Sequence, residues 1–304
     1  MKNSVSCLLL SFGLVVVVLM AGGCFRQWRT EPWETEPLAR GEIEVVELEG
    51  LSNLSLQRVR FYSEVMDSPR FLLSLMPITE NPPKEVFILN HGWRDRPEDL
   101  LSELEVAKVF ADLLVAGKVR PALVVLPDVR FDGFFRRNSG RFPNYLDLVA
   151  EEILEVISKQ YSIPLSNGKW SVGGFSFGGY LALDIARRYP GRFDSVSVVS
   201  GFFDEEWSFW PSSPPVPGKL DDKGRGKHTV VVPGPIPRVL LACGTDDRMF
   251  DDMTTLHGVL EARGIEHQWL VGPGNHDWEY WATALEPMMV FHLAAGQVAP
   301  DQGF

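Results

Sequence analysis

The sequence has few cysteines, no excess of positive charge and one long apolar run. Its 304 residues include three cysteines, and 29 basic residues stand against 40 acidic ones, for a formal net charge of −11. This balance, with no basic stripe along the chain, argues against nucleic acid as a partner. There is also no zinc-ligand spacing and no phosphate-binding loop. We therefore expect neither a metal nor an organic cofactor.

The long apolar run lies at the N-terminus. Residues 7–20 are too few for a comfortable membrane span, so residues 1–23 are predicted to form a signal peptide. Residues 19–24 read Leu-Met-Ala-Gly-Gly-Cys, which resembles the lipobox of bacterial lipoproteins, although Ala21 stands where Leu is usual. We expect an exported protein, anchored through a lipid on Cys24 and facing the periplasm or the cell exterior. Cleavage without lipidation, or a retained helix, is the alternative.

The rest of the chain divides into a tether and one folded domain. Residues 24–40 are rich in Glu, Pro, Trp and Arg without an apolar period, so they are expected to form the tether. The domain is predicted to span residues 41–298. Cys243 ends an apolar run in it and is expected to be a small buried side chain. No second cysteine remains in the mature domain for a disulfide.

Strand-like and helix-like segments alternate from residue 41 onward. Short, wholly apolar runs are typical of strands buried on both faces, and the segments between them have helical apolar spacing. This alternation predicts an α/β fold with a mostly parallel central sheet and helices on both faces. Strands are expected over residues 43–48, 57–63, 70–76, 85–89, 122–126, 170–173, 195–199, 239–242 and 266–271, and helices over residues 98–116, 144–160, 178–189, 252–263 and 278–295.

An insert over residues 202–237 breaks this alternation. It is rich in Pro, Gly, Trp and Phe, and a loop of this length inside a compact domain is usually functional or disordered. Its aromatic first half follows a predicted strand, and ligands bind at the carboxyl ends of parallel strands. We therefore predict that Trp207 and Trp210 line the substrate cleft. The alternative is that these rings cover part of the core.

A G-x-S-x-G motif at residues 174–178 supplies a candidate nucleophile. The motif alone is weak evidence, but an apolar strand precedes it and a helical pattern begins at Gly178. A nucleophile elbow requires this context, with glycines where side chains would clash with the neighbouring strand and helix. Ser176 is therefore the predicted nucleophile.

A serine nucleophile requires a base and an orienting acid, which follow it along the chain in such folds. His276 lies in a glycine- and proline-rich loop after the last predicted strand and is the predicted base. Asp246 and Asp247 both follow the preceding strand, and we favour Asp247 as the acid. Three other histidines are expected on helix or strand surfaces: His257, His267 and His292.

An oxyanion hole requires two backbone N–H groups. Phe177, directly after the nucleophile, is expected to supply one of them. Trp93, in the loop after the predicted strand at residues 85–89, is expected to supply the other, because Gly92 lets the chain turn tightly there. His91 is then a structural residue of this turn rather than a second base.

These motifs, in order and spacing, resemble the esterase D / putative esterase family. The residues that carry the resemblance are His91-Gly92, Gly174 to Gly179, Cys243 to Asp247, and Pro273 to Trp278 with Trp281. The resemblance spans about Leu56 to Leu293 and implies an α/β-hydrolase fold. The family's G-T-x-D motif supports Asp247 as the acid, and Phe177 replaces a Met that is common in the family.

The family includes feruloyl, acetylxylan and siderophore esterases, S-formylglutathione hydrolases and mycolyltransferases. The resemblance therefore implies a serine esterase acting on a carboxylic ester. The export expected from the N-terminal segment argues against a cytoplasmic glutathione thioester, so an acylated polysaccharide or a siderophore is the expected substrate class. Two alternatives are an acyltransferase with the same triad and a lipid-anchored binding module without catalysis. Burst acylation by an activated ester would exclude the binding module.

Overall fold

A computed structural model describes residues 31–34, 36–129, 142–166, 169–202 and 235–295. The predicted signal peptide and Cys24 lie outside this part of the chain, and so do Trp207 and Trp210. Within it, no helix is long and apolar enough to cross a membrane.

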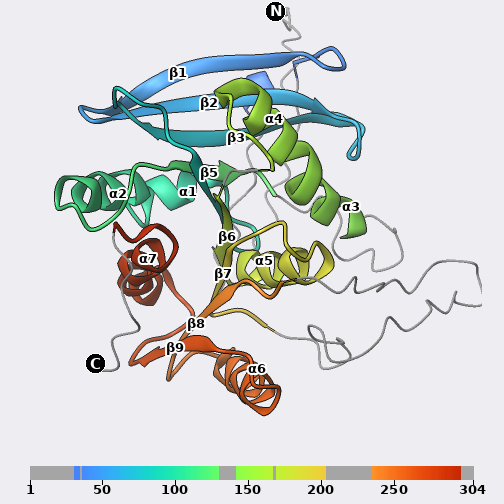
Figure 1. Cartoon of the computed structure of the whole chain (residues 1–304). Helices are drawn as coiled ribbons and strands as arrows, with labels where there is room; N and C mark the ends of the chain where they lie inside the picture. The colour runs from blue at the N-terminus through green and yellow to red at the C-terminus, as the bar shows by residue number, and fades with distance from the viewer. Residues whose placement is uncertain (1–30, 35, 130–141, 167–168, 203–234, 296–304) are drawn as a thin grey trace, which may run out of the picture. The chain divides into compact units, whose positions relative to one another are not determined.

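A nine-stranded sheet forms the centre of the fold (Figure 1), in the order β1-β2-β3-β5-β4-β6-β7-β8-β9. The first three strands form an antiparallel meander whose third strand pairs antiparallel with β5, and all pairs from β5 to β9 are parallel. The predicted fold class is confirmed. The strands are β1 (Ile43–Leu51), β2 (Leu54–Ser63), β3 (Ser68–Pro77), β4 (Glu85–Asn90), β5 (Leu123–Pro127), β6 (Lys169–Phe175), β7 (Ser195–Val199), β8 (Arg238–Gly244) and β9 (His267–Gly272).

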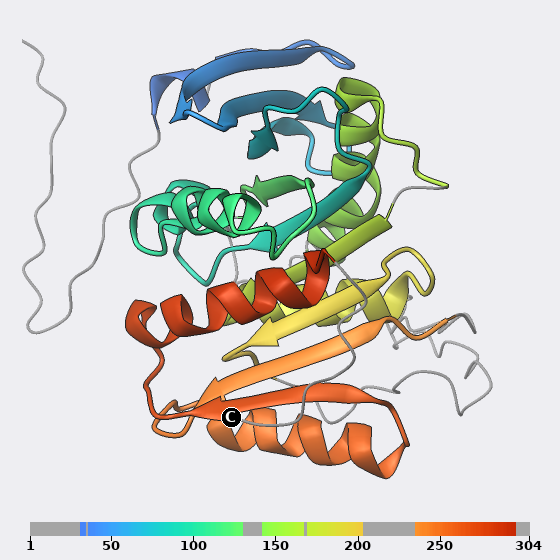
Figure 2. The ribbon, with the colours of Figure 1, turned by 60° about the vertical axis from the view of Figure 1, so that its left-hand side comes forward.

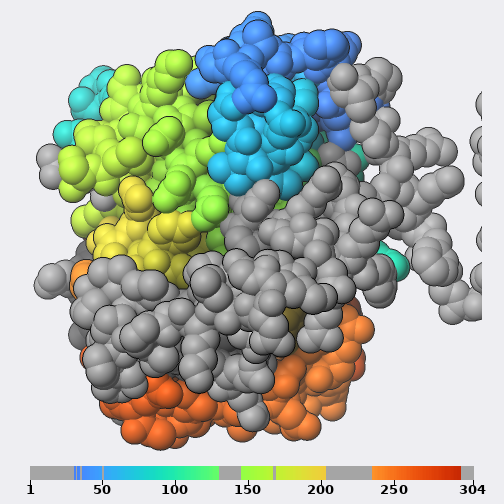
Figure 3. Space-filling view, turned by 90° about the vertical axis from the view of Figure 1, so that its right-hand side faces the viewer, coloured from blue at the N-terminus to red at the C-terminus, as the bar shows by residue number. Residues whose placement is uncertain are grey.

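Helices bury both faces of the sheet. Apolar side chains of α3 to α6 pack on one face, which Figure 3 views, and those of α1, α2 and α7 pack on the other (Figure 2). The helices keep water from the central strands, which explains why most of the residues in these strands are apolar. The helical segments are η1 (Pro32–Glu34), α1 (Pro97–Ser102), α2 (Val106–Val115), α3 (Phe142–Asp147), the π-helical η2 (Leu148–Ile153), α4 (Leu154–Tyr161), α5 (Phe177–Arg188), α6 (Phe250–Ala262) and α7 (Trp278–Leu293).

Two predicted helices differ from the structure. The helix expected over residues 98–116 is two helices, because the chain turns at Glu105, where φ is 48°. A left-handed glutamate gives no sequence signal, since glycine and asparagine are the usual residues there. The helix expected over residues 144–160 contains the π-helical η2 between α3 and α4.

The prediction that His292 lies on a surface is wrong. The side chain is 3% exposed and lies between α7 and the sheet. Its Nδ1 is 2.7 Å from Ser195 Oγ, and its Nε2 is 2.8 Å from Ser197 Oγ. Burial lowers the pKa of His292 well below its usual value, so the ring is neutral at physiological pH. The two strand serines satisfy both ring nitrogens, which makes the burial possible.

Candidate active site

Ser176 lies in the sharp turn between β6 and α5. Its φ of 52° and ψ of −119° are sparsely populated values for a residue with a side chain. The glycines of the motif explain how the turn fits. A Cβ at Gly178 would lie 2.4 Å from the carbonyl oxygens of Asn90 and His91, and one at Gly174 would lie 2.4 Å from the backbone of Gly178. Helix α5 can therefore begin this close to β4 because both positions lack a side chain.

Three side chains from three different loops form a continuous chain of hydrogen bonds. His276 Nε2 lies 2.8 Å from Ser176 Oγ. On the other side of the ring, Nδ1 lies 2.8 Å and 3.1 Å from the two carboxylate oxygens of Asp247. A carboxylate accepts hydrogen bonds, so Nδ1 carries the proton. In the neutral ring, Nε2 then accepts the hydrogen bond of the Ser176 hydroxyl.

The two neighbouring carboxylates lie in different environments. The Asp247 side chain is fully buried, and its Oδ1 also accepts the backbone N–H of Met249 at 2.8 Å. Asp246 is exposed, and its backbone N–H donates to the carbonyl of Gly274 at 3.0 Å. The structure therefore brings Asp247, and not Asp246, to His276.

The surroundings of His276 favour its neutral form. Burial lowers the pKa of its ring below the usual value, and the Asp247 carboxylate acts in the opposite direction. Trp281 packs edge to face against the ring, with centroids 5.2 Å apart. A neutral imidazole is the form that can take a proton, so the lowered pKa extends its use as a base to lower pH.

The two predicted oxyanion donors lie near the nucleophile. Phe177 begins α5, so its N–H lies at the positive end of that helix, beside Ser176. A Cβ at Gly92 would lie 3.6 Å from Ser176 Cβ, so the loop after β4 passes next to the nucleophile. The rings of Trp93 and Phe177 pack edge to face at 5.9 Å. These contacts place both residues beside Ser176.

His91 and Cys243 have structural contacts. His91 is 1% exposed, and its Nε2 accepts the backbone N–H of Val129 at 3.2 Å, which links the loops after β4 and β5. Cys243 is buried as predicted, and burial raises the pKa of its thiol to about 12. Its thiolate is therefore scarce at neutral pH. In the described part of the chain, no three His, Cys, Asp or Glu residues are grouped so as to hold a metal ion.

The structure shows one aromatic contact near the site that the sequence does not predict. Phe202, the first residue of the insert, stacks on Tyr180 with ring centroids 4.1 Å apart and also lies 6.1 Å from the Phe177 ring. The first residue of the insert therefore lies beside the residue that follows the nucleophile.

A nucleophile elbow with hydrogen-bonded Ser, His and Asp side chains on a mostly parallel sheet is typical of α/β-hydrolase-fold serine hydrolases. A family model described as "Putative esterase" matches residues 77–292. The chain therefore belongs to this esterase family and is classed as a carboxylic-ester hydrolase, and the resemblance inferred from the motifs is confirmed.

Individual relatives are distant. The chain is similar to an acetyl esterase of Caldicellulosiruptor saccharolyticus, with 22% identity over 258 residues, 75% of this chain and 94% of that enzyme. It is also similar to an endo-1,4-beta-xylanase/feruloyl esterase of Xylanibacter ruminicola, with 21% identity over 67% of this chain and 25% of that enzyme. The structure of the ferulic acid esterase AmCE1/Fae1A of Anaeromyces mucronatus, in complex with ferulic acid, matches with a TM-score of 0.62 and 23% identity, over 82% of this chain and 94% of that one. At such identity the structural likeness establishes the fold.

Proposed function

We propose that the protein is an exported serine esterase in which Ser176 is the nucleophile, His276 the base and Asp247 the orienting acid. One observation carries the proposal: the hydrogen-bonded chain from the buried Asp247 through His276 ends on a serine held in a left-handed turn. A serine hydroxyl is a weak nucleophile unless a base takes its proton, and this arrangement supplies the base and fixes its tautomer.

In the first step, Ser176 Oγ attacks the ester carbonyl carbon while its proton moves to His276 Nε2. The buried Asp247 carboxylate stabilises the imidazolium that forms. The carbonyl oxygen becomes an oxyanion, which we assign to the N–H groups of Phe177 and Trp93. The C–O bond to the leaving alcohol then breaks, and the alcohol takes the proton from Nε2. The product of this step is an acyl-enzyme on Ser176.

In the second step, water replaces the alcohol. His276 Nε2 takes a proton from the water as its oxygen attacks the acyl carbon, and the same N–H groups hold the second oxyanion. The bond to Ser176 Oγ then breaks, and Oγ recovers the proton from the imidazolium. The carboxylic acid leaves and the site returns to its starting state.

Two features argue against a binding module that keeps the fold without catalysis. A left-handed serine costs on the order of 1–3 kcal/mol and persists where the surrounding structure enforces it, most often at active sites. Burying the Asp247 carboxylate is also costly unless it is hydrogen-bonded. Binding a ligand requires neither feature, whereas both serve acyl transfer by a Ser-His-Asp triad in an α/β-hydrolase fold.

For the substrate we propose an acylated polysaccharide, with a siderophore ester as the second class to test. The names of the relatives, an acetyl esterase and a xylanase/feruloyl esterase, support the first. Trp207 and Trp210 of the insert are proposed to line the cleft, since the ring of Phe202, where the insert begins, lies 6.1 Å from the ring of Phe177, the residue after the nucleophile. Export and a lipid on Cys24 are proposed from the N-terminal sequence.

Labelling with a fluorophosphonate probe tests the nucleophile. The wild-type protein should be labelled at Ser176, and Ser176→Ala should lose both labelling and turnover of an activated ester. Ser200→Ala is a matched control, because Ser200 also has φ 52°, follows the adjacent strand β7 and is fully buried. That variant should keep labelling and turnover. Full turnover in Ser176→Ala would refute the proposal.

A panel of acetylated and feruloylated oligosaccharides, with a siderophore ester as comparison, tests the substrate class. We expect the highest kcat/KM among the acylated oligosaccharides. Preference for the siderophore ester would overturn the substrate class and leave the mechanism intact.

A further inference from the structure

The described residues before β1 lie against the domain, although the sequence predicts a tether there. We call residues 31–34 and 36–40 the strap. The Trp33 ring contacts one residue of β3 and one of β2. The Phe71 ring of β3 packs edge to face against it at a centroid distance of 4.9 Å, and the Arg58 guanidinium of β2 lies 3.8 Å from its centroid. An aromatic ring in such contacts adds stability beyond its buried area. Trp33 therefore fixes the N-terminal part of the strap to the sheet.

The strap follows β2 toward the β2–β3 hairpin. Arg58, Arg60 and Tyr62 alternate along β2 and so face the same side of the sheet. Arg60 donates to the carbonyl of Glu36 at 2.8 Å. Arg40 ends the strap at the hairpin, where its guanidinium hydrogen-bonds the Tyr62 hydroxyl at 3.4 Å. The strap thus contacts three successive residues of one face of β2.

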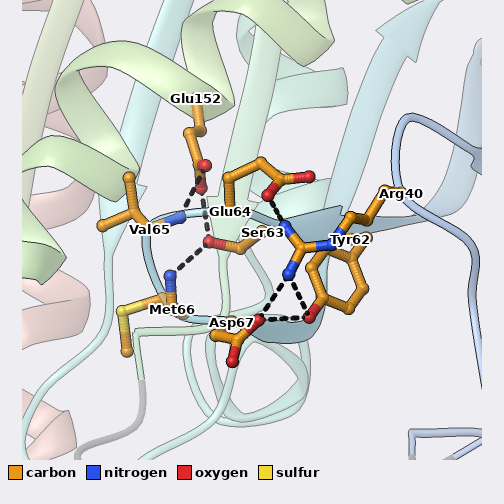
Figure 4. Close-up of polar contacts among 8 residues, drawn as sticks. All are labelled: Arg40, Tyr62, Ser63, Glu64, Val65, Met66, Asp67 and Glu152. Atoms are coloured by element: carbon orange, nitrogen blue, oxygen red, sulfur yellow. Dashed lines mark hydrogen bonds and ion pairs between the residues drawn. The ribbon is translucent and has the colours of Figure 1, made fainter.

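The hairpin that receives Arg40 is itself held in place (Figure 4). Arg40 forms ion pairs there with Glu64 and, at 2.8 Å, with Asp67. Glu152, from the π-helical η2, accepts the backbone N–H of Val65 at 2.9 Å and the hydroxyl of Ser63. The end of the strap is therefore attached to a segment that η2 holds against the domain.

At its other end the strap reaches the loop after β4. The Glu34 carboxylate forms an ion pair with Arg96, and the two side chains are 5% and 20% exposed. Arg96 directly precedes α1, and Trp93 lies three residues before it in the same loop. A mostly buried ion pair resists separation, because its charges have little access to water. Arg96 also pairs with Glu98 of α1 at 3.3 Å, so the two carboxylates hold its guanidinium together. Glu34 therefore restrains the loop near its C-terminal end.

The N-terminal end of this loop is restrained by β4 itself. The Asn90 amide donates to the carbonyl of Gly173 at 3.1 Å, next to the nucleophile elbow. Between the two restraints the chain turns, with Asp95 N–H donating to the carbonyl of Gly92 at 3.3 Å and Arg94 at a φ of 66°. Trp93 lies inside this turn. Its position relative to Ser176 thus depends on both ends of the loop.

We propose that Glu34 is a positioning residue for the esterase reaction: through Arg96 it fixes the loop that presents the Trp93 N–H to the oxyanion. This inference rests on the proposed function, because it assumes that Trp93 is a donor. It also makes the residues just after the predicted anchor part of the catalytic domain. Residues 25–30 then remain between the predicted anchor at Cys24 and the domain, fewer than in the tether predicted from the sequence.

The full-length variants Glu34→Gln, Arg96→Gln and the double variant test the proposal, with kcat, KM and Tm measured on an activated acetyl ester. Losing one oxyanion donor outright lowers kcat by about 10²–10³. Loosening the loop should cost less, so we expect kcat to fall about tenfold in each single variant with KM nearly unchanged. If both residues act through their pair, kcat of the double variant should be no lower than kcat of the more impaired single variant. Glu34→Asp should recover part of the lost kcat.

Glu85→Gln is the matched control. Glu85 lies at the opposite end of β4, is ion-paired with Arg120 at 2.8 Å and has a side chain 16% exposed. This variant should change Tm without changing kcat. A normal kcat in Glu34→Gln, or losses that multiply in the double variant, would overturn the positioning role. The Ser176→Ala variant, measured alongside, should lose turnover. If Ser176→Ala keeps turnover, the proposed function is refuted rather than the positioning role of Glu34.

Discussion

Exchanging the Asp247 carboxylate for an amide tests the central geometry of the site. Both oxygens of Asp247 lie within hydrogen-bond distance of His276 Nδ1, and the side chain is fully buried. In Asp247→Asn an amide NH₂ can face Nδ1, which favours the ring tautomer that carries its proton on Nε2. That tautomer cannot accept the Ser176 proton. The volume of the side chain hardly changes, so the fold should remain.

The magnitude follows from the same contacts. The analogous exchange in a serine protease lowers kcat by about 10⁴, which corresponds to about 5.4 kcal/mol at 1.36 kcal/mol per factor of ten. We expect a similar loss here, because no bulk water reaches Asp247 to replace the carboxylate. Asp246→Asn changes an exposed group, whose effect should stay within about 0.5 kcal/mol, or about twofold in rate.

Steady-state hydrolysis of a chromogenic acetyl ester, with Tm measured on the same samples, provides the assay. The expected result is a large fall in kcat for Asp247→Asn, a small change for Asp246→Asn and a similar Tm for both variants. The reverse ranking would move the acid to Asp246. Equal, small effects would mean that the hydrogen bond between Asp247 and His276 does not support catalysis.

Three further predictions concern pH, export and specificity. Burial lowers the pKa of His276, and the base must be neutral to accept a proton. As pH drops, kcat/KM should therefore fall with a midpoint below 6.5, the usual pKa of histidine. A midpoint above 6.5 in the pH–rate profile would contradict this. Globomycin should leave an unprocessed precursor in expressing bacteria, and Cys24→Ser should free the protein from membranes; a mature form that starts elsewhere without acyl mass would refute the lipid anchor. Trp207→Ala and Trp210→Ala should each lower kcat/KM on the natural ester, with near-normal rates on a small acetyl ester and unchanged Tm. A lower Tm with equal loss on both substrates would assign that ring to the core.

The sequence predicts those parts of the molecule in which a local pattern has one physical cause. Strands buried on both faces are mostly apolar, so β4 to β8 can be recognised in the sequence as short apolar runs. The nucleophile elbow can be recognised in the sequence because Gly174 and Gly178 have no room for a Cβ. Asp247 and His276 follow later strands in the order that the fold requires. Each of these predictions depends on neighbours in the sequence or on the order of the strands.

Other features depend on contacts between distant segments and leave no such pattern. The His292 ring can be buried because Ser195 and Ser197, nearly a hundred residues earlier, point at its two nitrogens. Glu34 and Arg96 are charged residues that a sequence places on the surface, yet their ion pair is mostly buried. Neither pair has a period or a motif, so the partner of each residue is known only after folding.

The strap illustrates why such contacts matter for a catalytic site. The site is assembled from loops at the carboxyl ends of four parallel strands, β4, β6, β8 and β9, so the strands fix where each loop begins but not where it ends. The loop after β6 continues directly into α5, and that after β8 is held where the backbone of Gly244 touches Gly274. The loop after β4 is longer. Near its far end the Glu34 ion pair acts beside the hydrogen bond that the Arg96 N–H donates to Asp99 at 2.9 Å. With Trp93 as the proposed oxyanion donor, residues outside the recognisable family motifs would determine how well the oxyanion is held, because a misplacement of about 1 Å can lower the rate by about 10².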